Sequence, residues 1–353
     1  MAKNRIFPEL PIPPHFDPEK VSQVWRVPYA ERAEQARAWA KTHNLQPNEQ
    51  DRFKISLVLI DIQNTFCIPD FELYVGGRSG TGAVEDNTRL VQFIYRNLGA
   101  ISHITMTLDT HQANQIFHPI FLVNDEGEHP SPYSLISKKD IQEGRWRFNR
   151  DLAEDLGVSG ETGQALLEHY TSQLAEKEKF DLTIWPYHGM LGGIGHALVS
   201  SVEEAVFFHT IARYSRPDFE IKGTYPFTEH YSAIGPEVLR GPGGEALGEK
   251  SNKLLRQIQE NDAVIFAGQA KSHCLAWTIN DLEQQIRETD LDLVGKVYLL
   301  EDCTSPVVVP GAIDYTATAD ADFAKFVNAG MHVVRSTDPL ATWPGIFSSE
   351  NNH

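Results

Sequence analysis

Short apolar runs of strand length alternate along this chain with longer stretches in which apolar residues recur at helical spacing. The runs of strand length cover residues 55–61, 103–108, 182–185, 205–208, 263–267, 296–300 and 332–334. Helical spacing marks residues 83–98, 192–203, 246–260, 275–289 and 314–329. This alternation predicts an α/β fold of three layers (αβα), with helices on both faces of a mostly parallel central sheet.

The chain ends and one long internal segment lie outside this alternation. Residues 1–53 are rich in proline at first and then helical through 29–39, which predicts an N-terminal extension packed on a core. The core domain is expected to span residues 54–345. Within it, residues 121–181 form a long insertion with a charged helix at 163–175. Such an insertion can serve as a lid or an oligomer contact.

Composition narrows the classes of partner and compartment. The 353 residues carry a formal net charge of −17, which argues against nucleic acid or an anionic membrane as a partner. No apolar run is long enough for a transmembrane helix, and the N-terminus lacks the apolar region of a signal peptide. Three cysteines do not make a disulfide framework. We therefore expect a cytoplasmic, reduced enzyme that acts on a small molecule and forms a homo-oligomer.

Reactive side chains recur after several of the predicted strands. Asp61, Asp109, His188 and Cys274 each follow an apolar run. Ligand sites in open α/β sheets lie outside the carboxyl ends of the strands, so these four side chains are expected to converge. An aspartate after a strand can also simply cap a helix or loop.

Cys274 closes a strand–turn segment and opens an amphipathic stretch. A thiol at a helix N-terminus has a lowered pKa, and the thiolate is its reactive form. The alternative is a small buried apolar side chain, as most free cysteines are.

Five segments follow one another along the chain: Asp61-Ile-Gln-Asn-Thr-Phe66, Asp109-Thr-His111, Trp185-Pro-Tyr-His188, Lys222-Gly223 followed by Tyr231-Ser-Ala233, and Gly268-Gln-Ala-Lys-Ser-His-Cys274. In the same order, they resemble the motifs D-x-Q-N-D-F, D-x-H, W-P-x-H, K-G…Y-S-A and G-x-A-x-x-x-C of the isochorismatase-like cysteine hydrolases, and among these the nicotinamidases most closely. Each motif is weak alone, but five in order are specific. The resemblance covers residues 55–336.

The resemblance implies a catalytic triad. Cys274 would be the nucleophile, Asp61 the base that takes the thiol proton, and Lys222 the cation that supports the thiolate. A surface lysine is the alternative for Lys222. The backbone N–H groups of Ala270 and Cys274 would form the oxyanion hole, with a cis peptide bond before Ala270.

The resemblance also implies one divalent metal ion beside the triad, which binds the pyridine nitrogen of nicotinamide. Asp109, His111 and His188 are ligand types suited to zinc, iron or manganese. His118 is the first candidate for a third histidine, although its gap from His111 is one residue longer than usual. His129 and His196 are alternates.

Three aromatic residues match positions that flank the substrate ring in nicotinamidases, namely Phe66, Trp185 and Tyr231; each could instead be ordinary core. The chain also departs from the family pattern. Thr110, Thr65, Gly189 and His273 stand where the family usually has tryptophan, an acid, cysteine and an aromatic residue. These departures concern the substrate more than the chemistry.

Three functions follow from this. The first is an amidohydrolase that cleaves nicotinamide or a related aromatic amide to the acid and ammonia through a thioester. The second is a relative that acts on another C–N bond, in a ureido or carbamoyl compound. The third is a catalytically idle binding module of the same fold.

Overall fold

The structure is a computed structural model that describes residues 8–177, 179–311 and 313–346. Residues 1–7 of the predicted extension and residue 178 of the predicted insertion lie outside the described residues. The chain forms two compact units. The first takes the chain up to Leu108, Ala197–Glu220 and the chain from Asn252 onward; the second takes Asp109–His196 and Ile221–Ser251. The predicted extents of the extension and the catalytic domain remain predictions.

A six-stranded sheet is the centre of the fold. Its order is β12 (His332–Val334), β9 (Val297–Leu300), β8 (Ala263–Gly268), β1 (Ile55–Ile60), β2 (Ile101–Asp109) and β7 (Asp218–Lys222). The pairs β12–β9, β9–β8, β8–β1 and β1–β2 are all parallel. Every residue of β1 and β8 is buried, as expected for strands covered on both faces.

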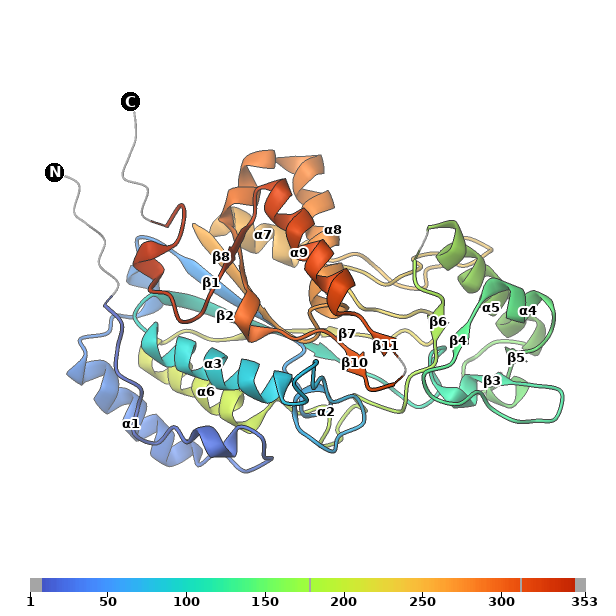
Figure 1. The fold of residues 1–353 in the computed structure, drawn as a ribbon, viewed down its shortest axis with the longest axis horizontal. Helices are drawn as coiled ribbons and strands as arrows, with labels where there is room; N and C mark the ends of the chain where they lie inside the picture. Colours follow the sequence, from blue (N-terminus) through green and yellow to red (C-terminus); the bar gives the residue numbers. More distant parts are fainter. Residues whose placement is uncertain (1–7, 178, 312, 347–353) are drawn as a thin grey trace. The chain divides into compact units, whose positions relative to one another are not determined.

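Helices of the first unit cover both faces of this sheet (Figure 1). One layer consists of α1 (Tyr29–Thr42), α3 (Gly82–Arg96) and α6 (Ser200–Arg213). The other consists of α7 (Lys253–Glu260), α8 (Cys274–Thr289) and α9 (Thr316–Ala329). The predicted three-layer αβα architecture is therefore confirmed. The one-turn helix α2 (Asn64–Cys67) and the antiparallel pair β10 (Val308–Val309) and β11 (Ile313–Asp314) complete this unit.

Some element predictions were wrong. The apolar run 205–208, predicted as a strand, lies inside α6, because a short apolar run does not distinguish a strand from a buried helix. The predicted helices at 192–203 and 246–260 begin only at Ser200 and Lys253. The strand β7 was not predicted, since its sequence is mostly exposed and charged.

The second unit is built from short elements. β3 (Leu122–Val123) pairs antiparallel with β5 (Arg147–Phe148), and β4 (Leu135–Ile136) with β6 (Leu182–Thr183). The run at 182–185 is therefore not a strand of the central sheet. α4 (Lys138–Gln142) and α5 (Gly160–Glu176) are its helices, and α5 confirms the helix predicted at 163–175. Among the described residues, no helix is both long and apolar enough to cross a membrane.

Candidate functional site

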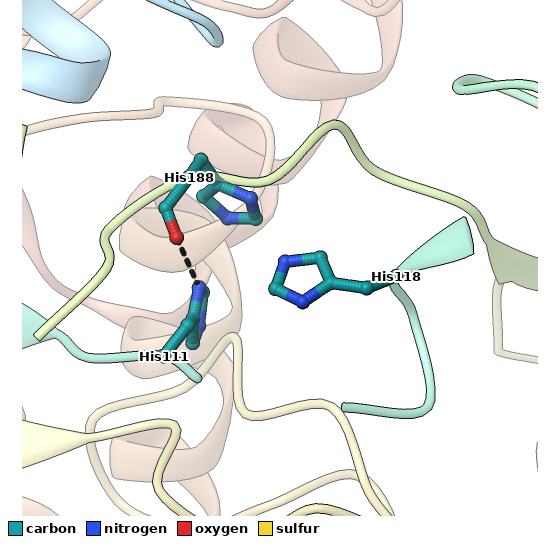
Figure 2. A group of neighbouring side chains, drawn as sticks. All are labelled: His111, His118 and His188. Atoms are coloured by element: carbon teal, nitrogen blue, oxygen red, sulfur yellow. Dashed lines mark hydrogen bonds between the residues drawn. The ribbon is translucent and has the colours of Figure 1, made fainter. Parts of the chain in front are cut away.

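Three buried histidines of the second unit lie together (Figure 2). One ligand atom from each of His111, His118 and His188 lies within 4.8 Å of those of the other two. These side chains are 3%, 0% and 4% exposed. His111 comes two residues after the end of β2, whereas the other two come from irregular segments. His188 therefore reaches this group without following a strand of the central sheet, contrary to the strand-end argument.

The three imidazole rings have the same hydrogen-bonding pattern. The Nδ1 atoms of His111, His118 and His188 lie 3.1, 3.0 and 2.7 Å from backbone carbonyl oxygens, those of His188, Gln112 and Pro186 respectively. Because a carbonyl oxygen can only accept, each Nδ1 must carry the proton and donate it. In a neutral imidazole of this tautomer Nε2 keeps its lone pair, which is the arrangement of metal-binding histidines.

Burial favours the neutral, metal-binding form of two of these imidazoles, those of His118 and His188. It lowers the pKa of His118 to about 3, with nearby His188 and His111 lowering it further. Burial likewise lowers the pKa of His188. The Nε2 of His118 is buried and has no hydrogen-bonding partner among the described residues. A buried acceptor of this kind is costly unless something binds it, so the group fits a divalent cation.

Asp109 lies beside this group as the last residue of β2. Its Oδ1 is 3.0 Å from Nε2 of His111, and its Oδ2 is 3.8 Å from Nε2 of His188. Burial would raise the pKa of Asp109, but the charges of His111 and Lys222 and hydrogen bonds from the histidines hold it well below its usual range. A carboxylate this close to an imidazole lone pair needs a positive charge between them, either a proton or a metal ion.

Two glycines allow the backbone to pack against Asp109 and His111. Gly223 has φ +85°, and a Cβ there would lie 2.8 Å from Nε2 of His111 and 2.9 Å from Oδ1 of Asp109. Gly189 has φ +58°, and its Cβ would lie 2.8 Å from the carbonyl oxygen of Asp109. Gly189 stands where the family usually has cysteine, and here a side chain has no room.

Lys222 is a buried residue at the end of β7, not a surface lysine. Its Nζ lies 2.9 Å from Oδ1 of Asp109 and 2.9 Å from the carbonyl oxygen of His230. His230 precedes the Tyr231-Ser-Ala233 motif and has no role predicted from the sequence; its Nδ1 accepts the backbone N–H of Gly223 at 3.1 Å. This contact fixes the turn that follows Lys222.

In the first unit, Asp61 directly follows β1 and is fully buried. Its backbone N–H donates to the Thr107 hydroxyl at 2.9 Å, and that hydroxyl donates to Oδ1 of Asp61 at 2.5 Å. Thr107 faces Asp61 from the neighbouring strand β2, and only the strand pairing reveals this partner.

Cys274 is the first residue of α8 and is buried, in agreement with the predicted helix start. The peptide bond between Gln269 and Ala270 is cis, as the resemblance implies. The Gln269 side chain donates to Asp86 of α3 at 2.9 Å and accepts the backbone N–H of Ser305 at 3.2 Å. Asp86 therefore helps to hold the side chain of Gln269 beside the cis peptide bond, and the sequence motifs did not indicate this residue.

The other two cysteines are chemically unlike a nucleophile. Burial raises the pKa of Cys67 to about 12. Burial also raises the pKa of Cys303 well above its usual range, and the charge of Asp302 adds to this. Both thiols are therefore protonated at neutral pH.

Two of the three aromatic candidates touch each other. The indole Nε1–H of Trp185 donates to the Tyr231 hydroxyl at 2.9 Å, and both residues belong to the second unit. The backbone N–H of Trp185 donates to Phe117 beside His118 at 2.8 Å, which ties the tryptophan to the histidine group. Phe66 belongs to the apolar core of the first unit.

The alternate ligands are occupied elsewhere. Nδ1 of His129 lies 2.6 Å from the carbonyl oxygen of Leu122. Nε2 of His196 lies 2.8 Å from the hydroxyl of Thr110, the residue that replaces the family's tryptophan. Neither histidine belongs to the three-histidine group, so His118 is the better choice.

The protein is similar to known proteins in its structure but matches none of those compared by sequence. No protein-family model matches the chain, and no curated protein matches it in sequence. The solved structures that it resembles include nicotinamidases and pyrazinamidases.

Three of these structures illustrate the range. An Acinetobacter baumanii nicotinamidase/pyrazinamidase is 16% identical, with 82% of this chain and 98% of that chain covered and a TM-score of 0.48. The yeast nicotinamidase bound to nicotinaldehyde is 15% identical, with 80% and 99% covered and a TM-score of 0.49. The Pyrococcus horikoshii pyrazinamidase in complex with zinc is 17% identical, with 80% and 98% covered and a TM-score of 0.41. Values this low do not assign an activity to this chain.

Proposed function

We propose that this protein is a metal-dependent cysteine amidohydrolase that cleaves an aromatic amide, with nicotinamide as the first candidate. The observation that carries the proposal is the common orientation of His111, His118 and His188. All three donate from Nδ1 to backbone carbonyls and keep Nε2 for a ligand. This arrangement suits a cation site rather than a solvated surface cluster.

His111, His118 and His188 would hold a divalent ion of zinc, iron or manganese, with Asp109 as a fourth ligand. When bound, the ion supplies a Lewis-acid position for the ring nitrogen of a pyridine-like substrate. Lys222 shares Asp109 with this group and would balance its negative charge.

The chemistry that we propose uses the residues of the sequence motifs. Asp61 accepts the thiol proton, and the sulfur of Cys274 attacks the amide carbonyl carbon. Backbone N–H groups of Ala270 and Cys274 stabilise the oxyanion, and Lys222 supports the anionic state. The C–N bond then breaks, and the nitrogen leaves as ammonia with the proton from Asp61. Water cleaves the thioester, which yields the carboxylic acid and regenerates the thiol.

Trp185 and Tyr231 would form one wall for the substrate ring, and Phe66 would contribute a further contact. A planar ring stacks well on aromatic faces. The backbone N–H of Trp185 donates to the carbonyl oxygen of Phe117, the residue before His118, which supports a ring position beside the histidine group.

Ammonia release from a panel of amides tests this function. The panel contains nicotinamide, pyrazinamide, benzamide and several ureido and carbamoyl compounds, each measured with added zinc, iron or manganese. We expect release from a heteroaromatic amide, and a loss of at least about 10³-fold in Cys274→Ala but not in Cys67→Ala. Release from ureido or carbamoyl compounds alone would replace this proposal with the second function. Release from none of the panel would favour a binding module.

A further inference from the structure

A buried carboxylate is hydrogen-bonded to Tyr231 of the aromatic pair Trp185–Tyr231. Glu229 is 3% exposed. Its Oε1 accepts the Tyr231 hydroxyl at 2.5 Å, and its Oε2 accepts the Tyr170 hydroxyl at 2.7 Å. The backbone N–H of Glu229 donates back to the Tyr170 oxygen at 3.1 Å. Tyrosine hydroxyls therefore hold both oxygens of this acid.

The direction of each hydrogen bond in this network is fixed by chemistry. An indole N–H can only donate, so the Tyr231 oxygen accepts from Trp185 at 2.9 Å. The Tyr231 proton then points to Glu229, as the 2.5 Å contact requires. Trp185, Tyr231, Glu229 and Tyr170 thus form a single connected chain. Such a chain restricts the rotamers of all its members.

Keeping an acid at this position has a cost. Burial raises the pKa of Glu229 to about 7, although the hydrogen bonds from Tyr231 and Tyr170 oppose this rise. An apolar residue would fill the same space without desolvating a charge. The carboxylate offers a separate oxygen to each of the two hydroxyls, which an apolar side chain cannot do.

Tyr170, at one end of this hydrogen-bonded series of side chains, belongs to the long insertion. Tyr170 is a fully buried residue of α5, the main helix of residues 121–181. A second insertion residue, Tyr133, lies edge-on to Trp185, with ring centroids 6.1 Å apart and an interplanar angle of 88°. The insertion therefore touches Trp185 directly and also reaches it through Tyr170 and Glu229.

We infer that Glu229 and Tyr170 are positioning residues through which the insertion sets the place of the Trp185–Tyr231 wall, and thereby the affinity for a planar ring. This inference rests on the proposed function and adds a specificity role for the insertion. Neither residue is assigned a step in the chemistry. Substrate binding should therefore respond to their substitution, while the triad should not.

Four variants test the inference. Glu229→Leu removes both acceptors, whereas Glu229→Gln keeps one carbonyl oxygen and should restore part of the effect. Tyr170→Phe removes only the outer hydroxyl. Tyr225→Phe is the matched control, because Tyr225 is an exposed tyrosine outside the Trp185–Tyr231–Glu229–Tyr170 network. The steady-state constants for nicotinamide, the rate of Cys274 alkylation by iodoacetamide and the metal content are measured for each.

We expect KM to rise about tenfold in Glu229→Leu, which corresponds to about 1.4 kcal/mol. The rise should be about threefold in Glu229→Gln and Tyr170→Phe and absent in Tyr225→Phe. The kcat, the alkylation rate and the metal content should stay within about twofold. The indole ¹H–¹⁵N resonance of Trp185, assigned with Trp185→Phe, should shift in the first three variants alone.

Two results would overturn the inference while leaving the proposed function intact. One is an unchanged KM in the folded variants of an active enzyme. The other is a loss of metal and kcat together with KM, which indicates a merely structural role. If Glu229→Leu does not fold, Glu229→Gln and Tyr170→Phe decide the matter by the same criteria. A wild-type protein that hydrolyses no aromatic amide refutes the proposed function, and the inferred role is refuted with it.

Discussion

Lys222 and Asp109 form a buried ion pair, with Nζ 2.9 Å from Oδ1. Asp109 also lies 3.0 Å from His111, so one carboxylate serves both the lysine and the histidine group. Lys222, one of the three residues proposed for the triad, is thus linked to the proposed metal ligands through the side chain of Asp109. Their roles are separable by experiment, because removing the lysine leaves the carboxylate in place.

Substituting Lys222 should separate turnover from metal binding. In Lys222→Met, we expect amide hydrolysis to fall by at least about 100-fold, while Asp109 and the histidines still bind the metal. Elemental analysis and ammonia release on the same sample provide the measurement. Lys139→Met is the control, since Lys139 is exposed and forms an ion pair with Glu143 at the surface. Metal loss that parallels the activity loss would instead make Lys222 a part of the metal site.

The three cysteines should differ sharply in reactivity. Burial raises the pKa of Cys67 to about 12 and that of Cys303 well above its usual range. Cys274 begins α8, where the helix dipole favours a thiolate. We expect iodoacetamide to alkylate Cys274 at least about 100-fold faster than the other two in native protein at pH 7.5, as measured by peptide mapping. Equal labelling of Cys67 would contradict the assignment of the nucleophile.

His118 and His129 make a matched pair for the metal site. Both belong to the second unit, and both bond through Nδ1 to a backbone carbonyl. Only His118 belongs to the three-histidine group. His118→Ala should lower metal affinity by about 10- to 100-fold, whereas His129→Ala should leave it unchanged. Titration with zinc against a competing chelator measures this. Equal affinities in the two variants would remove His118 from the ligand set.

Gly223 and Gly244 test the close approach of the backbone to the site. Their φ angles are +85° and +86°, so alanine costs about the same backbone strain, roughly 1 kcal/mol, at both. A Cβ at Gly223 would lie 2.8 Å from His111, whereas at Gly244 nothing lies within 4 Å. Gly223→Ala should therefore lose metal affinity in addition to stability, and Gly244→Ala only stability. Chemical denaturation and zinc titration distinguish these effects, and retained affinity in Gly223→Ala would refute the argument.

A buried histidine of the first unit should make the metal-free protein sensitive to acid. Nε2 of His209 donates to the carbonyl oxygen of Ile101 at 2.9 Å, and burial lowers its pKa to about 4. The unfolded chain, with a pKa near 6.5, binds more protons between these values, so stability falls as pH decreases from 6.5 towards 4. The loss is roughly 3 kcal/mol at the lower end.

His209→Gln keeps a donor but does not titrate, so its free energy of unfolding should depend less on pH in that window. Urea denaturation in the presence of EDTA from pH 4.5 to 7.5 measures the slope. His103→Gln, which removes a partly exposed histidine beside Asp218, is the control. An unchanged slope in His209→Gln would contradict the prediction.

Much of the fold follows from local pattern. The strands β1, β8, β9 and β12 and the helices α1, α3, α8 and α9 lie where apolar runs and helical spacing predict them. Where burial and periodicity disagree, the prediction failed. Residues 205–208 are an apolar run inside α6, and β7 is a strand with an exposed, charged sequence. The pattern of apolar residues predicts which residues are buried. Packing against neighbouring elements determines whether those residues form a helix or a strand.

The sequence by itself determined the residue types of the site and their order along the chain. Asp109, His111 and His188 were expected as ligands, and the cis bond before Ala270 was implied by the motif. Only the tertiary structure decided that His118, rather than His129 or His196, lies beside His111 and His188, because this depends on where irregular segments turn. The same holds for Thr107, Gly189 and Tyr170, which lie far along the chain from the residues that they contact. Local sequence encodes chemistry and periodicity, whereas packing between distant segments determines which polar atoms meet.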